Sequence, residues 1–65
     1  MNNLKKIRKT KGMTQEFVAK SSGIGIRTYS RYESQKENRF PEIQTAIRIA
    51  DVLGISDLRV IWSLN

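Results

Sequence analysis

The fold of this 65-residue chain is decided by residues 14–33, which read TQEFVAKSSGIGIRTYSRYE. Thr14 is a suitable helix N-cap, because its hydroxyl can accept a hydrogen bond from a backbone N–H of the first turn. Gly23 can end the helix that follows, because glycine reaches positive φ without a steric penalty. Gly25 stands where a second helix needs its own N-cap. The stretch therefore predicts two short helices, over about residues 15–22 and 26–34, joined by a tight turn.

The second of these helices has two chemically different faces. At about 100° per residue, Tyr29 and Tyr32 fall on one face, with Glu33 at its edge. The opposite face carries cationic and hydroxylic side chains spaced at i, i+3, i+4 and i+7, namely Arg27, Ser30, Arg31 and Ser34. We expect the tyrosines to pack in the core rather than to stack on bases. The outer face predicts contact with a partner outside the domain, and ordinary surface arginines are the simpler alternative.

Three further helices are predicted over about residues 3–11, 42–53 and 57–63. Gly12 and Gly54 follow the first two and suit helix C-termini, and Ser56 is a candidate N-cap for the last. Phe40, next to the single proline, is expected to fold inward. The clearest amphipathic stripe predicts core residues over 42–53, namely Ile43, Ala46, Ile47, Ala50 and Leu53. No segment alternates as a half-buried strand does, so we expect an all-α, five-helix single domain over residues 1–65.

The composition excludes several kinds of site. The chain has no cysteine and no histidine, which removes disulfides, thiolate metal ligands and the usual neutral-pH proton carrier. The six acidic residues are scattered, with no pair that predicts a catalytic site. We therefore expect no enzyme activity, no metal and no cofactor. The N-terminal segment has no apolar h-region and the longest apolar runs are three residues, so a soluble cytoplasmic protein is expected.

The net charge of +6 is concentrated in one half of the chain. Residues 1–33 contain eight Lys and Arg against two Glu, which gives +6, whereas residues 34–65 contain four charges of each sign. Such a one-sided basic field favours a polyanionic partner, either nucleic acid or an anionic membrane surface. A solubilising surface is the simpler alternative. The membrane is disfavoured, because the first three helices lack a broad apolar face beside their lysines.

A wider pattern of residues surrounds the two-helix stretch. It comprises Arg8, Gly12 to Glu16, Val18, Ala19, Gly23, Ile24, Ser30 to Glu33, Pro41, Ile49, Ala50 and Leu53 to Ser56. This pattern resembles the lambda-repressor/Cro-type helix-turn-helix family over about residues 4–61. The resemblance implies a compact five-helix domain with its helix-turn-helix at about residues 15–34. It also implies that the second helix of the motif enters the major groove of double-stranded DNA.

The resemblance assigns roles to individual residues. Base reading falls on the second motif helix, at Ile26, Arg27, Ser30 and Arg31. Phosphate contacts fall at the start of the first motif helix, on the second, and in the loop that follows it, at Gln15, Thr28, Lys36, Asn38 and Arg39. A structural ion pair is implied between the arginine of the first helix and the glutamate that closes the second motif helix, Arg8 and Glu33.

The same resemblance implies a transcription regulator, which we expect to be a dimeric repressor that reads a palindromic operator. One recognition helix reads few base pairs, and two half-sites about 34 Å apart would add selectivity. Apolar residues of the last helix, Val60, Trp62 and Leu64, are the expected homodimer contact. The sequence ends just after that helix, so no small-molecule effector is expected. A protein-interaction module that keeps this fold, such as an antitoxin or an adaptor, is the alternative.

Overall fold

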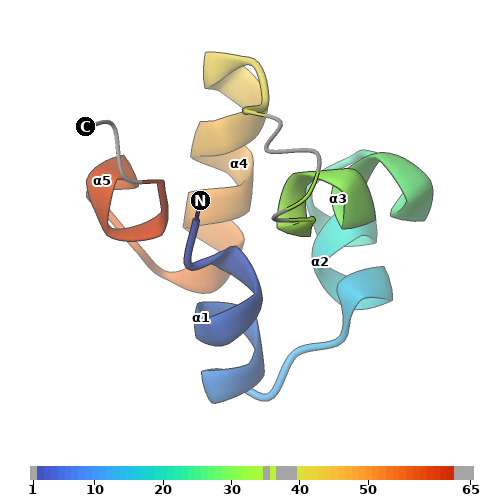
Figure 1. The fold of residues 1–65 in the computed structure, drawn as a ribbon, viewed down its shortest axis with the longest axis horizontal. Coiled ribbons are helices and arrows are strands. Elements are labelled where there is room, and N and C mark those ends of the chain that lie inside the picture. The colour runs from blue at the N-terminus through green and yellow to red at the C-terminus, as the bar shows by residue number, and fades with distance from the viewer. Residues whose placement is uncertain (1, 35, 37–39, 63–65) are drawn as a thin grey trace.

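The computed structural model describes residues 2–34, 36 and 40–62. Those residues form five α-helices: α1 (Leu4–Thr10), α2 (Gln15–Ser21), α3 (Ile26–Glu33), α4 (Ile43–Leu53) and α5 (Leu58–Ile61) (Figure 1). No strand occurs among the described residues, where the one β-type pairing is an isolated bridge between Asn2 and Trp62. The prediction of an all-α, five-helix fold is therefore confirmed.

The turn between α2 and α3 forms as its residues predict. The Thr14 hydroxyl caps α2 by accepting a hydrogen bond of 3.0 Å from a backbone N–H of the first turn. Gly23 has a φ of 75°, which glycine adopts freely. The N–H of Ile24 then donates to the Ala19 carbonyl at 3.0 Å, and Gly25 occupies the N-cap of α3. These local features set the direction in which α3 leaves α2.

The central helix of the core is α4, which packs against α2 on one side and α5 on the other (Figure 1). Its buried side chains are Ala46, Ile49, Ala50 and Leu53. They form one cluster with buried side chains from the other helices, namely Leu4, Val18, Ala19, Tyr29 and Ile61. Full burial of a large aliphatic side chain contributes about 1.5–3 kcal/mol, so this cluster is the main source of stability.

Two residues of the predicted α4 stripe lie outside the core. Ile43 is 59% exposed and Ile47 is 46% exposed, so the prediction that they are buried is wrong. Ile49, which the stripe omitted, is fully buried instead. At 100° per residue, Ile43 and Ile47 lie at one edge of the buried arc of α4. Phe40 is also half-exposed rather than folded inward, although its ring centre lies 5.3 Å from that of Trp62.

The last helix is shorter than predicted. Its N-cap is Asp57, whose carboxylate accepts a hydrogen bond of 2.9 Å from the Arg59 N–H, so the prediction of Ser56 as N-cap is wrong. The helix has four residues and ends where Trp62 adopts an extended backbone. Trp62 then pairs with Asn2 in the antiparallel bridge. This bridge holds the N-terminal segment against the end of α5.

Candidate nucleic-acid interface

The periodicity that buries one side of α3 exposes the other. Tyr29 is fully buried on the core side, whereas Arg27, Thr28 and Arg31 are exposed. At 100° per residue, the predicted base-reading residues occupy one arc of the helix, in the order Ile26, Ser30, Arg27 and Arg31. The Ser30 hydroxyl donates to the Arg27 carbonyl at 3.3 Å. Because glycine caps α3, the cap places no side chain in front of this arc.

A buried ion pair joins the end of α3 to α1. Arg8 Nε lies 2.5 Å from Glu33 Oε2, and Arg8 Nη2 lies 3.3 Å from Glu33 Oε1. Arg8 is 7% exposed and Glu33 is 4% exposed. The third guanidinium nitrogen, Nη1, donates to the Met13 carbonyl at 2.7 Å. The structure thus brings together the two residues for which an ion pair is implied, and the same guanidinium holds the loop between α1 and α2.

Gln15, the first residue of α2, is bound to this ion pair. Its Nε2 donates to Glu33 Oε1 at 2.9 Å, so the start of α2 is held against the end of α3. A side-chain amide has two N–H donors, and this hydrogen bond uses one of them. The half-buried Gln15 side chain therefore has a fixed position and a second donor for another acceptor.

Burial and hydrogen bonds determine the charge states of Arg8, Glu33 and Tyr29. Burial alone would raise the pKa of Glu33, but the hydrogen bonds from Arg8 and Gln15 outweigh it and lower that pKa below the ordinary glutamate value. The hydrogen bond to Glu33 also raises the pKa of Arg8. Burial, together with the neighbouring Glu33 carboxylate, raises the pKa of Tyr29 above the usual tyrosine range. At neutral pH, Arg8 and Glu33 are therefore both charged, and the neighbouring Tyr29 is neutral.

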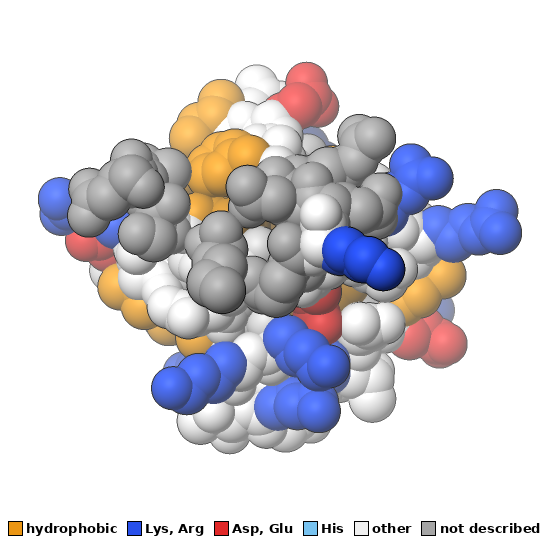
Figure 2. All heavy atoms as spheres, viewed as in Figure 1, with side chains coloured by type: hydrophobic (Ala, Val, Ile, Leu, Met, Phe, Trp, Pro, Cys, Tyr) orange, Lys and Arg blue, Asp and Glu red, His pale blue; other side chains and the backbone are white. Residues whose placement is uncertain are grey.

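Three of the five predicted phosphate contacts lie among the described residues. Thr28 is exposed on α3 itself, Lys36 is exposed just after it, and Gln15 lies at the start of α2. Two further predicted contacts, Asn38 and Arg39, lie outside the described residues. Figure 2 shows Lys and Arg side chains beside α2 and α3 and also over α1. The cationic surface therefore includes the α3 side of the molecule.

The three predicted dimer contacts have different placements. Val60 is 48% exposed on α5, and Leu64 lies outside the described residues. Trp62 requires a correction, because it is only 3% exposed. Its side chain belongs to the core cluster, so it is not open to a second copy of the chain.

The described residues contain neither a metal centre nor a membrane span. No group of acidic side chains in that part of the chain could hold a metal ion. No helix in it is long and apolar enough to cross a bilayer; α4 has 11 residues, whereas a span needs about 20.

A helix-turn-helix family model matches residues 4–59, which include α1 to α4. The chain belongs to the Cro/C1-type helix-turn-helix family. It is 41% identical over 54 residues to YqaE of Bacillus subtilis (strain 168), which is named an uncharacterized HTH-type transcriptional regulator. The match covers 83% of this chain and 45% of that protein, so the chain spans less than half the length of this relative. No solved structure matches the chain.

Two features around the helix-turn-helix have no signal in the local sequence. The Gln15–Glu33 hydrogen bond joins side chains from different helices. Arg48, which is exposed on α4, has Nη1 3.8 Å from the point where a Cβ on Gly23 would stand. Both arrangements arise only after the helices pack. A side chain at position 23 would be opposed by the positive φ, whereas its Cβ would lie at an ordinary van der Waals distance from this guanidinium.

Acidification is expected to destabilise the helix-turn-helix through Glu33. Its pKa is lowered in the folded chain, so the ion pair contributes full stability above the unfolded glutamate pKa of about 4.3. That contribution is lost as the pH falls through the lower, folded pKa. The measurement is the free energy of unfolding from neutral pH downward. Glu33→Gln should lack the part of the loss in unfolding free energy that comes from protonation of Glu33.

Asp57→Asn is the matched control for this pH dependence. It removes an exposed carboxylate whose pKa is lowered by the hydrogen bond from Arg59. The acid-dependent loss that belongs to Glu33 should persist in that variant. An unchanged acid profile in Glu33→Gln would contradict the assignment of the pH dependence to the buried pair.

Proposed function

We propose that this chain is a sequence-specific, double-stranded-DNA-binding transcription regulator. The observation that carries the proposal is the exposed arc of α3, which holds Arg27 and Arg31 on the second helix of a helix-turn-helix. In this motif the second helix lies in the major groove while the first crosses the backbone. The Bacillus subtilis relative carries the name of a transcriptional regulator. DNA binding needs no catalytic centre and no cofactor, and the proposed place of action is the cytoplasm.

The two arginines supply the sequence readout. A guanidinium can donate two hydrogen bonds to O6 and N7 of guanine, and a good pair of this kind contributes about 1–3 kcal/mol of discrimination. Arg27 and Arg31 lie side by side in the exposed arc of α3. Ile26, at the first turn, offers an apolar contact to a thymine methyl, and the Ser30 hydroxyl can donate or accept a hydrogen bond.

The buried ion pair orients a phosphate contact. Gln15 Nε2 is held 2.9 Å from Glu33 Oε1, so its second N–H has a fixed direction before DNA binds. Such preorganisation reduces the entropy lost on binding. Thr28, Lys36, Asn38 and Arg39 complete the proposed phosphate contacts. Contacts of this kind give affinity and register without sequence information.

The regulator is proposed to act as a homodimeric repressor on a palindromic operator. A single α3 reads too few base pairs for selectivity, and a two-fold dimer reads two half-sites about 34 Å apart. The exposed apolar side chains among the described residues include Val60 on α5 and Ile43 and Ile47 on α4, which are available for pairing. Repression then follows from occupation of promoter DNA.

Lys36→Ala is expected to weaken DNA binding evenly across sequences. An ammonium that neutralises one phosphate releases a counterion, so its loss should make the slope of log K against log salt shallower by about 0.9. Affinity titrations over a range of salt concentrations measure this slope. Arg59→Ala removes an exposed, Asp57-paired cation on α5 and should leave the slope unchanged. An unchanged slope in Lys36→Ala would remove Lys36 from the DNA footprint.

Selection of binding sites from random double-stranded DNA tests the proposed function directly. We expect a palindromic consensus that binds more tightly than unrelated DNA in titrations at low and high salt. A consensus without two-fold symmetry would support DNA reading and contradict the dimer. The absence of enrichment would overturn the proposal and favour a protein-interaction module that retains the helix-turn-helix.

A further inference from the structure

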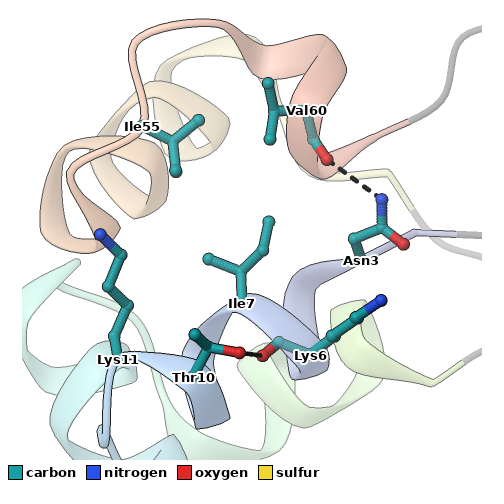
Figure 3. A pocket seen from close by; sticks show the side chains of 7 residues that line it. All are labelled: Asn3, Lys6, Ile7, Thr10, Lys11, Ile55 and Val60. Carbon is teal, nitrogen blue, oxygen red and sulfur yellow. Dashed lines mark hydrogen bonds between the residues drawn. The ribbon is translucent and has the colours of Figure 1, made fainter.

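A groove lies between α1 and the segment that carries α5. It has a volume of about 360 Å³ and is lined by Asn3, Lys6, Ile7, Thr10, Lys11, Ile55 and Val60 (Figure 3). Positions 3, 6, 7 and 10 recur at i, i+3, i+4 and i+7, so one face of α1 and its N-cap forms one wall. Asn3 Nδ2 donates to the Val60 carbonyl at 3.2 Å, which fixes α5 as the facing wall.

Three aliphatic side chains form the floor of this groove. Ile7, Ile55 and Val60 turn toward one another across it (Figure 3). Ile7 and Ile55 are half-buried and pack against the core, whereas Val60 is exposed. A concave site with contiguous apolar side chains is typical of a binding surface rather than of a solvated face.

Two lysines stand at the rim of the groove. Lys6 and Lys11 are exposed, and neither ammonium forms an ion pair with the described part of the chain. Lys11 Nζ lies 4.0 Å from the point where a Cβ on Gly54 would stand, beside the C-terminal end of α4. Arg8, which reaches α3, lies on a different face of α1. Both lysines thus line the groove between α1 and the α5 segment, and neither lies on α3, which carries the proposed base-reading residues.

We propose that this groove docks a short, acidic, amphipathic segment of another protein. Its aliphatic side chains would cover Ile7, Ile55 and Val60, and its carboxylates would meet Lys6 and Lys11. These lysines are five positions apart, which is about 7.5 Å along the axis of α1. A helical segment matches that spacing with carboxylates about one to two turns apart. This inference goes beyond DNA binding and does not depend on it.

Charge and shape disfavour other occupants. A second copy placed on this face by two-fold symmetry would bring Lys6 and Lys11 of both chains into one interface, where like charges repel. A small molecule would stay largely exposed in this open groove, whereas small-molecule sites bury about 70–90% of their ligand. Val60 is thus assigned to a different partner protein, and the proposed dimer would pair through other exposed apolar side chains, such as Ile43 and Ile47.

A displayed library of random short peptides, selected on the full chain, provides the probe. We expect enrichment of peptides that combine Leu, Ile or Phe with Asp or Glu. The charge-reversal variant Lys6→Glu/Lys11→Glu should bind an enriched peptide at least about tenfold more weakly, because two attractive contacts become repulsive. Lys5→Glu/Lys9→Glu is the matched control, since it makes the same charge change at exposed positions of α1 outside the groove.

The control variant should lose less than about threefold in affinity, because its charges are more distant and screened by salt. Val60→Ser changes an exposed side chain and should weaken peptide binding while the thermal unfolding midpoint is retained. The proposal is overturned by a selection without enrichment, by equal losses in the two charge variants, or by full peptide binding in Val60→Ser. Self-association that Val60→Ser abolishes, without peptide enrichment, would assign the groove to a second copy.

Discussion

Replacement of Arg8 by alanine is expected to lower the free energy of unfolding by about 3–5 kcal/mol. The change leaves the Glu33 carboxylate buried without its cation, and it removes the donor to the Met13 carbonyl. A 65-residue domain buries about 60% of its unfolded surface and has a small total stability. The loss is therefore expected to unfold a large fraction of the molecules. Urea unfolding followed by far-UV circular dichroism measures it.

Two further variants separate the charge effect from a general sensitivity of α1. Lys9→Ala changes the adjacent exposed residue and should stay within about 0.5 kcal/mol of the unmodified chain. Arg8→Met/Glu33→Leu removes both charges and should recover most of the lost stability, because well-packed apolar side chains can replace a buried pair. A loss below about 1 kcal/mol in Arg8→Ala would match a solvated surface pair and contradict the burial seen here.

Much of the helix-turn-helix could be predicted because its signals are local. The Thr14 cap, the positive φ of Gly23 and the N-cap at Gly25 each act over a few residues, and all three form in the structure. The period of α3 likewise separates a buried Tyr29 from an exposed Arg27 without reference to any other helix. Such features do not depend on tertiary packing, which a sequence pattern does not specify.

The features that could not be predicted depend on packing between distant segments. Which arc of α4 is buried depends on where α2 and α5 lie, so the apolar pattern alone placed Ile43 and Ile47 wrongly. The end of α5 depends on the bridge between Asn2 and Trp62. In the candidate site, the exposed face of α3 follows from its period, but the hydrogen bond that fixes Gln15 does not. The choice of bases stays a prediction because it depends on the DNA as well.

Arg27→Ala is expected to lower affinity for the selected operator by about 5- to 150-fold, which corresponds to about 1–3 kcal/mol. The alanine removes both donors of a bidentate guanine contact, and preference should relax at that base position. Binding to unrelated DNA should fall much less. Arg27 is exposed on α3, so stability should change by no more than about 0.5 kcal/mol. Titrations with the operator, single-base variants of it and an unrelated duplex measure these effects.

Arg27→Lys distinguishes a base contact from a phosphate contact. Lysine keeps the positive charge but lacks the planar fork of the guanidinium, so it can restore attraction to phosphate and not the bidentate guanine contact. We expect Arg27→Lys to bind unrelated DNA as the unmodified chain does, and to bind the operator nearly as weakly as Arg27→Ala. Rescue by lysine would make Arg27 a phosphate contact. The guanine contact would then pass to Arg31, the next cation along the exposed arc of α3.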